Sequence, residues 1–421
     1  MQDFQNHNTN VILLLLRDVL LRYSGDYQGY KKAATQLHEI LRYSPAYSEY
    51  TVSLCDYFEE ACKTFPTEPP FADGKKIMVF SLLCWGENYI HNLLYFCFAS
   101  LLAEGNIPGL SKERNIIIAI HTDAKSAEII SRHPITDRLQ SYGVRLRYFL
   151  LPDNLISTIN SDPNNKYWLL GVSQTLHMIY AKRLNADLHV SAPDEIYSSE
   201  FFGTILRKVH EGAKVITQST FRSDINKMLP LIEGYRKDGV ISIDAPQLAA
   251  HALNNAHPSV ERVKMNNRQS PLHWPASQQL LWEGEDTLHV ICQHQHPVFI
   301  SAEIISRLKD RYYHTLDSEL EKIVPDDCAV ECPKAEDNMM MVEVSPPDQF
   351  PPQPYVDIEQ YCNHFWQRTG TSKLMKFFNL ETVLKIDKTI RRCPNPMSKK
   401  DIRNTQKVIR TNVEVSCPFE E

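Results

Sequence analysis

Glycine is scarce in this chain, and several familiar nucleotide-binding and catalytic motifs are missing from it. The 421 residues include 14 glycines against 25 prolines. Neither G-x-G-x-x-G nor G-x-x-x-x-G-K-[ST] occurs, so we expect no glycine-rich dinucleotide site and no P-loop. The absence of H-E-x-x-H argues against a zincin-type protease, and the absence of G-x-S-x-G argues against a nucleophile-elbow hydrolase.

Long hydrophobic runs are missing as well. The longest apolar run near the start covers residues 11–16 and ends at Arg17. Six residues span about 9 Å as a helix, whereas the hydrocarbon layer of a bilayer is about 30 Å thick. Asp3 is the only charged residue ahead of this run, so the basic leader of a secretory signal is lacking. We therefore expect no transmembrane segment and a cytoplasmic location.

Positive charge is not in excess. The chain has 45 Lys and Arg residues against 51 Asp and Glu residues, which gives a net charge of −6. Such a chain has no global positive field, and we expect no nucleic-acid partner. The tail at 385–410 is locally basic, which favours a solvated helical end; contact with acidic lipid headgroups or a nucleic acid is the alternative.

The ten cysteines are scattered and never form C-x-x-C. Cys328 and Cys332 are four residues apart, and no paired knuckle lies within about 20 residues, so a zinc ribbon fits poorly. The pattern favours free, buried thiols in a reducing compartment.

The middle of the chain alternates between predicted strands and predicted helices. Continuous apolar runs at 76–82 and 115–120 are typical of strands that are buried on both faces. Further strands are predicted at 144–150, 186–191, 213–217 and 287–293, and helices at 87–103, 124–132, 166–184, 201–211 and 246–256. The alternation predicts an α/β fold with a mostly parallel sheet and helices on both faces.

Helical patterns precede this region. Apolar spacings of three and four predict helices over 11–65, including one at 47–65. Residues 29–45 resemble the second half of a tetratricopeptide repeat, and an ordinary helical cap is the alternative. One partial repeat cannot bury its own apolar face, so it would dock on something else, which makes a protein partner a candidate.

The chain is accordingly divided into three parts. We predict an N-terminal helical segment at 1–66, a polar Pro-rich linker at 67–74 and an α/β domain at 75–320. The remainder, 321–421, combines an acidic, Pro-rich stretch with C-terminal helices. The acidic stretch at 326–353 is expected to be an irregular surface segment, and 356–381 to be helical.

Ligands of parallel α/β sheets bind at the carboxyl ends of the strands, which directs attention to the residues after each apolar run. Asp194 follows the predicted strand at 186–191, on a turn entered through Pro193. Its carboxylate can hold a divalent cation, which would neutralise a diphosphate. The alternative is that Asp194 caps the helix that follows.

Two further positions near strand ends offer polar groups. Thr122 and Asp123 can hydrogen-bond a base or a ribose, and they can equally well cap the helix at 124–132. Arg222 is a candidate for forked contact with a phosphate.

Histidines are concentrated near one further strand end. His294 and His296 are two residues apart, and Pro297 favours a break in the strand there. With His273 and His289 they form a local group of imidazoles, which suits metal ligation, phosphate contact or proton transfer. The alternative is ordinary hydrogen-bonded structure.

The order of these elements is similar to the nucleotide-sugar half of GT-A-type glycosyltransferases. The resemblance rests on the strand ending in Thr122-Asp123 and on the run from Asn185 to Asp194. Later signatures resemble those of a group of bacterial GT-A-like proteins: His210-Glu211-Gly212, His257-Pro258 and residues 282–297. The resemblance covers roughly residues 75–320.

This resemblance implies a Rossmann-like GT-A fold and transfer of a sugar from a nucleotide sugar to an unknown acceptor. Asp194 matches the second acid of the family's Asp-x-Asp motif, whereas Ala192 occupies the position of the first. The implied cofactor is Mn2+ or Mg2+, with Asp194 and His296 as metal ligands. The implied substrate-binding residues are Thr122, Asp123, Asp194, Arg222 and His294, and no catalytic base is identified.

Two other functions stay open. Because the first acid of the motif is missing, the chain could be a degenerate member that only binds, with its terminal helices contacting a protein partner. A metal-dependent hydrolase or nucleotidyltransferase that uses the histidine group is the other.

Overall fold

The computed structural model describes most of the chain between residues 45 and 407. The described residues are 45–161, 166–219, 221–258, 264–266, 278–292, 295–309, 313, 315–316, 320–325, 327–348, 381–391, 397–404 and 406–407. Among them, no helix has both the length and the apolar character that crossing a bilayer requires.

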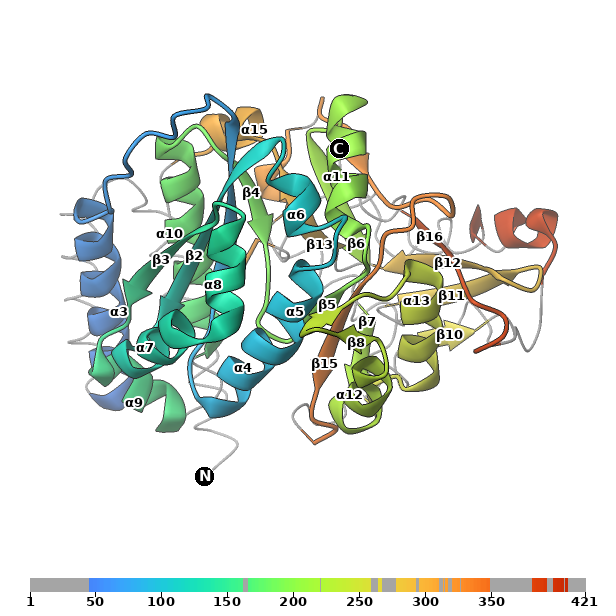
Figure 1. Cartoon of the computed structure of the whole chain (residues 1–421), viewed down its shortest axis with the longest axis horizontal. Helices are drawn as coiled ribbons and strands as arrows, with labels where there is room; N and C mark the ends of the chain where they lie inside the picture. The colour runs from blue at the N-terminus through green and yellow to red at the C-terminus, as the bar shows by residue number, and fades with distance from the viewer. Residues whose placement is uncertain are drawn as a thin grey trace, which may run out of the picture.

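A seven-stranded sheet forms the centre of the molecule (Figure 1), in the order β14-β6-β13-β4-β1-β2-β3. Its strands are β1 (Lys76–Leu83), β2 (Arg114–Thr122), β3 (Arg145–Leu150), β4 (Asp187–Val190), β6 (Val215–Ser219), β13 (Gln295–Ile300) and β14 (Val330–Glu331). Strand β13 runs antiparallel to β4 and β6, and the other neighbouring pairs are parallel. The predicted mostly parallel sheet is confirmed.

Helices cover both faces of this sheet because successive strand residues point to opposite sides. Met78 and Phe80 of β1 pack into one core cluster, whereas Val79 between them packs into another. The first face is covered by α4 (Glu87–Asn92), η1 (Leu93–Cys97), α5 (Phe98–Leu101), α6 (Ile107–Leu110), α7 (Ala124–Arg132), α8 (Pro134–Ser141) and α11 (Phe201–His210). The second face is covered by α10 (Lys166–Arg183) and α15 (Ala302–Arg307).

The helices predicted at 124–132, 166–184 and 201–211 correspond to α7, α10 and α11. The single helix predicted at 87–103 is instead α4, η1 and α5, of which η1 is a π-helical turn. Of the predicted N-terminal helices, the one at 47–65 is confirmed as α3 (Pro45–Lys63), which packs with α9 (Asp153–Ser161) against α10. The repeat-like residues 29–44 and the predicted helix at 356–380 lie outside the described residues.

Smaller sheets flank the central one. A three-stranded sheet has the order β5-β15-β7, a four-stranded sheet the order β10-β11-β12-β16, and β8 pairs with β9. Their bounds, with the remaining helices, are β5 (Glu195–Tyr197), β7 (Phe221–Asp224), α12 (Ile225–Glu233), β8 (Arg236–Lys237), β9 (Val240–Ile241), α13 (Ala245–Asn254), β10 (Lys264–Asn266), β11 (Gln278–Glu283), β12 (Thr287–Cys292), α16 (Leu320–Ile323), β15 (Met341–Ser345) and β16 (Thr382–Lys385).

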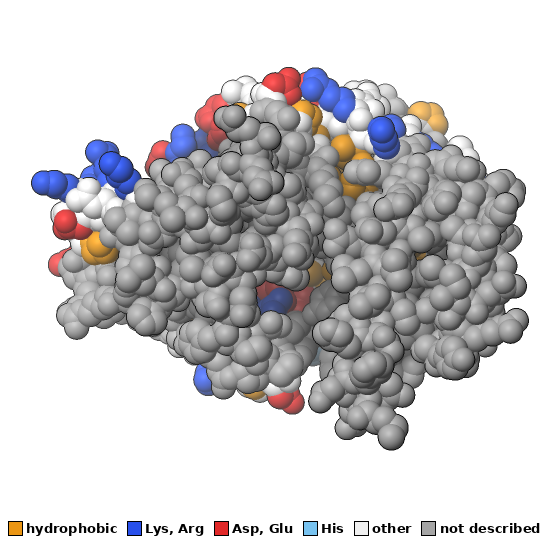
Figure 2. Space-filling view, turned by 180° about the vertical axis from the view of Figure 1, so that it is seen from behind, with side chains coloured by type: hydrophobic (Ala, Val, Ile, Leu, Met, Phe, Trp, Pro, Cys, Tyr) orange, Lys and Arg blue, Asp and Glu red, His pale blue; other side chains and the backbone are white. Residues whose placement is uncertain are grey.

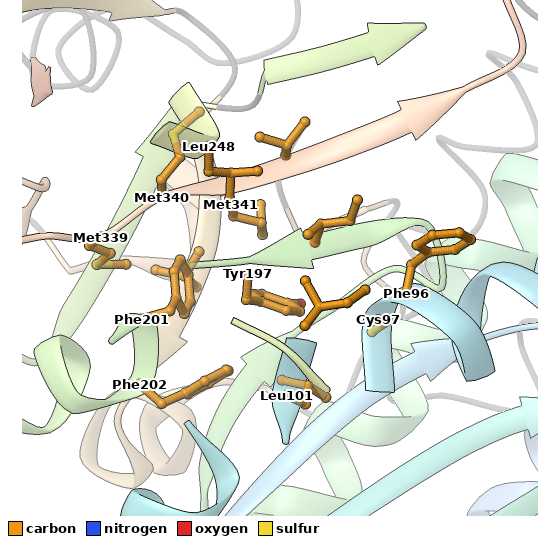
Figure 3. Packing of buried hydrophobic residues seen from close by; sticks show 14 of the residues in the cluster. Phe96, Cys97, Leu101, Tyr197, Phe201, Phe202, Leu248, Met339, Met340 and Met341 are labelled. Carbon is orange, nitrogen blue, oxygen red and sulfur yellow. The ribbon is translucent and has the colours of Figure 1, made fainter. Parts of the chain in front are cut away.

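The expectation of an irregular surface segment at 326–353 is wrong. Strand β15 lies in the middle of its sheet, and four of its five residues are buried. Met339, Met340 and Met341 pack in the same cluster as Phe201 and Phe202 (Figure 3). The apolar residues Met339–Val342 and Val344 therefore outweigh the acidic, Pro-rich residues around them. The predicted domain boundary at 320 stays a prediction, although β14, β15 and β16 pair with strands that precede it.

Three histidines are fully enclosed in the core of the central sheet. The Nδ1 atom of His121 lies 2.9 Å from Ser173 Oγ, and that of His177 lies 2.8 Å from Ser81 Oγ. Burial lowers the pKa of His177 to about 3 and that of His121 well below the usual range. Burial also lowers the pKa of His189 to about 3. All three imidazoles are therefore neutral in the folded protein at neutral pH.

These imidazoles predict a loss of stability in mild acid. The three imidazoles take up protons below pH about 6.5 in the unfolded chain, whereas in the folded chain His177 and His189 do so only near pH 3, and the pKa of His121 is also well below its usual range. The free energy of unfolding should therefore fall with decreasing pH through this window, by up to about 1.4 kcal/mol per pH unit for each histidine.

Urea unfolding between pH 7 and pH 4 measures this slope. His177→Asn, which keeps a group able to bond Ser81, should reduce the slope by about a third. The exposed His91, changed to Asn, is the control and should leave the slope unchanged. An unchanged slope in the His177 variant would contradict the assignment.

Candidate functional site

A row of three charged residues crosses the sheet β5-β15-β7. Glu343 of β15 is in register with Glu195 of β5 on one side and with Arg222 of β7 on the other. Directly opposite residues of neighbouring strands project from the same face and are close enough to interact. Asp194 directly precedes this row, and its carbonyl oxygen accepts a hydrogen bond from the Val344 amide at 2.9 Å. Strand β15, which the sequence did not predict, therefore holds the row together.

Arg222 and Glu343 form a close ion pair within the row. The Nε and Nη2 atoms of Arg222 lie 2.8 and 2.7 Å from the same oxygen, Oε1, of Glu343. The two side chains retain 28% and 19% of their surface, so the pair is partly accessible from outside. Arg222 therefore presents positive charge at the surface while its carboxylate partner holds it in place.

Asp194 is buried beside this pair. Burial, Glu343 and Glu195 together raise the pKa of the Asp194 carboxyl well above its usual range, and Arg222 opposes them. Strand β5 follows this residue directly, and the N-cap position of α11 belongs to Glu200. The alternative that Asp194 caps the next helix is therefore wrong, and no helix end explains its position.

Lys166 is a member of the site that the sequence did not single out. It is the first residue of α10, and burial together with the charge of Arg222 lowers the pKa of its amine. The charges of Asp194 and Glu343 act in the opposite direction. Lys166 thus comes together with residues that are 28 to 177 positions away in the chain, and no local pattern signals this.

Glu195, one of the three residues of the row, is also the centre of a buried hydrogen-bond network. Its Oε2 atom accepts hydrogen bonds from the Tyr197 hydroxyl and from Ser191 Oγ, the latter at 3.1 Å. The Tyr197 hydroxyl also lies 3.1 Å from His189 Nε2. Burial is the main reason why the pKa of Glu195 is raised. These hydrogen bonds hold strand β5 in place and fix the Glu195 carboxylate, whose Oε1 atom lies beside His296.

His296, the second residue of β13, reaches this network. Its Nε2 atom donates a hydrogen bond to the Val190 carbonyl at 2.9 Å and lies 3.5 Å from Glu195 Oε1. His289, in contrast, belongs to β12 of the four-stranded sheet, where Glu283 and Glu381 lie 2.8 Å from its two nitrogens. Burial alone would lower the pKa of His289. The hydrogen bonds and charges of Glu381 and Glu283 have the larger combined effect, so the pKa of His289 is raised. The expected single group of imidazoles is therefore divided between two sheets, while His273 and His294 lie outside the described residues.

Asp123 and Thr122 lie at the end of β2. Asp123 is the N-cap of α7 and accepts hydrogen bonds from the backbone and the hydroxyl of Ser126, at 2.8 and 2.6 Å. Burial raises the pKa of the Cys84 thiol, and the charges of Asp194 and Asp123 add to this effect. Both carboxylates thus act on one thiol at the end of β1. Thr122 is buried, and among the described residues its hydroxyl has no hydrogen-bond partner.

The donor set for a metal ion is incomplete. In the part of the chain that the structure describes, no group of three or more His, Cys, Asp and Glu side chains is arranged to hold one. Glu343 is occupied by Arg222, and the contacts of His296 are Val190 and Glu195. These residues do not fit the Mn2+ or Mg2+ site predicted from the sequence.

Charged side chains also line a hollow on the surface of the molecule. The face seen in Figure 2 is hollowed near its centre, and both basic and acidic side chains are visible in the hollow. Mixed charge at an accessible, concave surface is suited to a ligand that carries both phosphate and hydroxyl groups.

Comparison with solved structures gives a coarse likeness. No family model matches the chain, and no curated protein matches its sequence. Among solved structures, it is similar to a mannosyltransferase from Pyrobaculum calidifontis in complex with GDP-Man and Mn2+. The sequences are 9% identical, the TM-score is 0.30, and the match covers 89% of this chain and 82% of that one. A likeness at this level carries no argument about chemistry, for which the side chains of the site are the basis.

The network around Glu195 predicts an unequal response of two tyrosines whose hydroxyl groups are buried. Tyr197→Phe removes the hydroxyl that joins Glu195 to His189, and it should lower the free energy of unfolding by about 1–3 kcal/mol. The Tyr148 hydroxyl is buried without a partner among the described residues, so Tyr148→Phe is a matched control that should be neutral or stabilising. Urea unfolding compares the two variants, and equal losses would contradict the network.

Proposed function

We propose that this chain is a glycosyltransferase that transfers a sugar from a nucleoside diphosphate sugar to the hydroxyl group of an acceptor. The observation that carries the proposal is the charged row, in which an accessible Arg222 is fixed by Glu343 next to a buried Asp194. A guanidinium is well suited to a phosphate group. Buried carboxyl groups are suited to the hydroxyl groups of a sugar, because they can accept hydrogen bonds from them.

The position of the row in the fold supports the same function. Val190 is the last residue of β4, and Asp194 follows it at the carboxyl end of that strand. Parallel α/β sheets bind their ligands at this edge. We propose that the fold is GT-A-like and that Thr122, Asp123 and His294 complete the contacts with the nucleotide sugar, with Asp123 on the nucleoside. A cytoplasmic location and kinship with bacterial GT-A-like proteins belong to the same proposal.

The reaction needs one bond to form and one to break. An acceptor oxygen bonds to the anomeric carbon, the acceptor proton leaves to solvent or a base, and the bond to the diphosphate breaks. The electron pair of that bond departs with the diphosphate. Arg222 stabilises the negative charge that develops there, and the site holds donor and acceptor together. Asp194 positions the donor. The earlier assignment of Asp194 and His296 as metal ligands stays a prediction, and none of these steps depends on it.

A binding function without catalysis is the second candidate. Ala192 at the position of the first motif acid favours it. In that case the site would bind a nucleotide sugar without turning it over, and the terminal helices would contact a protein partner.

Asp194→Asn separates the two candidates. The substitution removes a carboxyl group whose charged form is disfavoured by burial, so at neutral pH the folded protein should gain about 1 kcal/mol of stability. If the chain is a glycosyltransferase, kcat/KM should nevertheless fall about 100-fold.

The measurement is nucleoside diphosphate release from a panel of GDP-, UDP- and CMP-sugars, with and without Mn2+, alongside thermal unfolding. Asp153→Asn is the matched control, because Asp153 is an exposed carboxylate that follows β3 as Asp194 follows β4. Failure of every donor to stabilise or react with the wild-type protein would contradict the proposed function. Binding without turnover would support the second candidate.

A further inference from the structure

The imidazole of His289 lies between two carboxylates in the four-stranded sheet. Its Nε2 atom is 2.8 Å from Glu283 Oε2, and its Nδ1 atom is 2.8 Å from Glu381 Oε1. An ionised carboxylate only accepts hydrogen bonds, and a neutral imidazole carries a proton on one nitrogen only. Both contacts are therefore hydrogen bonds only when His289 is doubly protonated and positively charged.

The C-terminal segment, defined here as residues 397–404 and 406–407, packs on the face of the sheet that carries this imidazole. Leu281 of β11 is in register with His289 of β12, so the two side chains project from the same face. Leu281 is buried in a cluster with Ile402 of the segment. The segment therefore covers the side of the sheet on which His289 lies.

The two carboxylates connect the imidazole to this segment. Glu283 Oε1 lies 3.3 Å from Lys399 Nζ, and Glu381 Oε1 accepts a hydrogen bond from Gln406 Nε2. The Lys399 side chain is 74% exposed, so solvent screens its charge and it offsets little of the charge of Glu283. The His289 side chain is only 14% exposed. Its positive charge therefore holds both carboxylates where they contact the segment.

Other charged groups surround this arrangement without entering it. Among the described residues, the hydrogen bonds and ion pairs of the imidazole are those with Glu283 and Glu381. Elements packed on this part of the sheet also carry Glu285, Asp286, Lys385, Lys388, Lys400, Asp401, Arg403 and Lys407. Asp286 pairs with Lys385 at 3.0 Å, and Glu285 pairs with Lys388 at 3.5 Å. Carboxylates and lysines of ordinary pKa keep their charge between pH 6 and pH 9, whereas an imidazole can titrate there.

We propose that His289 is a pH-sensitive latch, which holds the C-terminal segment on the four-stranded sheet while its imidazole is doubly protonated and releases the segment when one proton is lost to solvent. After that loss, one ring nitrogen presents a lone pair to a carboxylate, and the two acceptors repel each other. The glutamate that has lost its donor turns towards water, and the segment loses an anchor. Release exposes the apolar side chains of Leu281 and Ile402.

The direction of the pH dependence follows from the two carboxylates. Burial alone would lower the pKa of His289, but Glu381 and Glu283 raise it above its usual value. The stabilisation is therefore fully present below pH about 6.5, where the imidazole is charged even after release, and it is lost as the pH rises through the raised pKa. The buried imidazoles of the central sheet have the opposite dependence, at lower pH.

Hydrogen–deuterium exchange between pH 6 and pH 9, measured by mass spectrometry and corrected for the intrinsic pH dependence of exchange, tests this inference. Protection of peptides that cover 397–407 should fall about tenfold or more from pH 6 to pH 9, because a charge-assisted hydrogen bond is lost. Peptides from β2 should keep their protection and serve as the internal reference for an intact core.

Three variants assign the effect to the imidazole. His289→Gln removes the titrating group, so the segment should exchange rapidly at pH 6 and show no further response to pH. Glu283→Gln keeps the size of the side chain but removes one carboxylate charge, so the pH at which protection is lost should fall by about 1. His91→Gln, at an exposed histidine of α4, is the control and should respond as the wild type does.

Equal protection of the segment at pH 6 and pH 9 in the wild-type protein would overturn the inference. A wild-type pH response in His289→Gln would also overturn it, as would a loss of protection that extends to β2 in the wild type, because the whole protein would then be unfolding. These outcomes are independent of the proposed sugar transfer, which is assigned to residues of other strands.

Discussion

The ion pair between Arg222 and Glu343 is the interaction on which the rest of the site depends. Glu343 lies between Glu195 and Arg222, so it faces one like charge and one opposite charge across neighbouring strands. Without Arg222, two carboxylates would be adjacent in a largely buried place, with Asp194 beside them, and their repulsion would oppose closure of the small sheet. With it, the row becomes a stable arrangement that still exposes a guanidinium.

The packing of the small sheet explains how residues that are so far apart in sequence are held in one place. Strand β15 runs between β5 and β7, and the methionines at its start pack against the aromatic side chains of α11. The apolar contacts hold β15 in place, and β15 in turn holds Glu343 between Glu195 and Arg222. Under the row, Tyr197 and Ser191 hold Glu195, which in turn lies beside His296. The charged row is thus supported by a buried polar network, and the hydrophobic core surrounds that network.

Much of the central fold follows from short-range sequence patterns, whereas the site follows only in part. Apolar runs such as Ile116–Ile120 predict buried strands because both faces of the sheet are covered. Asp194 and Arg222 could be selected because each is near the end of a predicted strand. Glu343 was missed because its strand is embedded in acidic, Pro-rich sequence, although the apolar run from Met339 to Val342 directly before it was a usable signal. Lys166 could not be found, because only the tertiary fold brings it to Arg222.

The central claim is that the charged row, with its partly accessible Arg222–Glu343 pair, forms the site of a nucleoside diphosphate sugar. A crystal structure of the protein soaked with GDP or with a donor identified by screening, in the presence of EDTA, tests this most directly. The account predicts density for the diphosphate within hydrogen-bond distance of the Arg222 guanidinium, with the Arg222–Glu343 pair retained. Density for the nucleotide at another part of the molecule, or a diphosphate held away from Arg222, would contradict it.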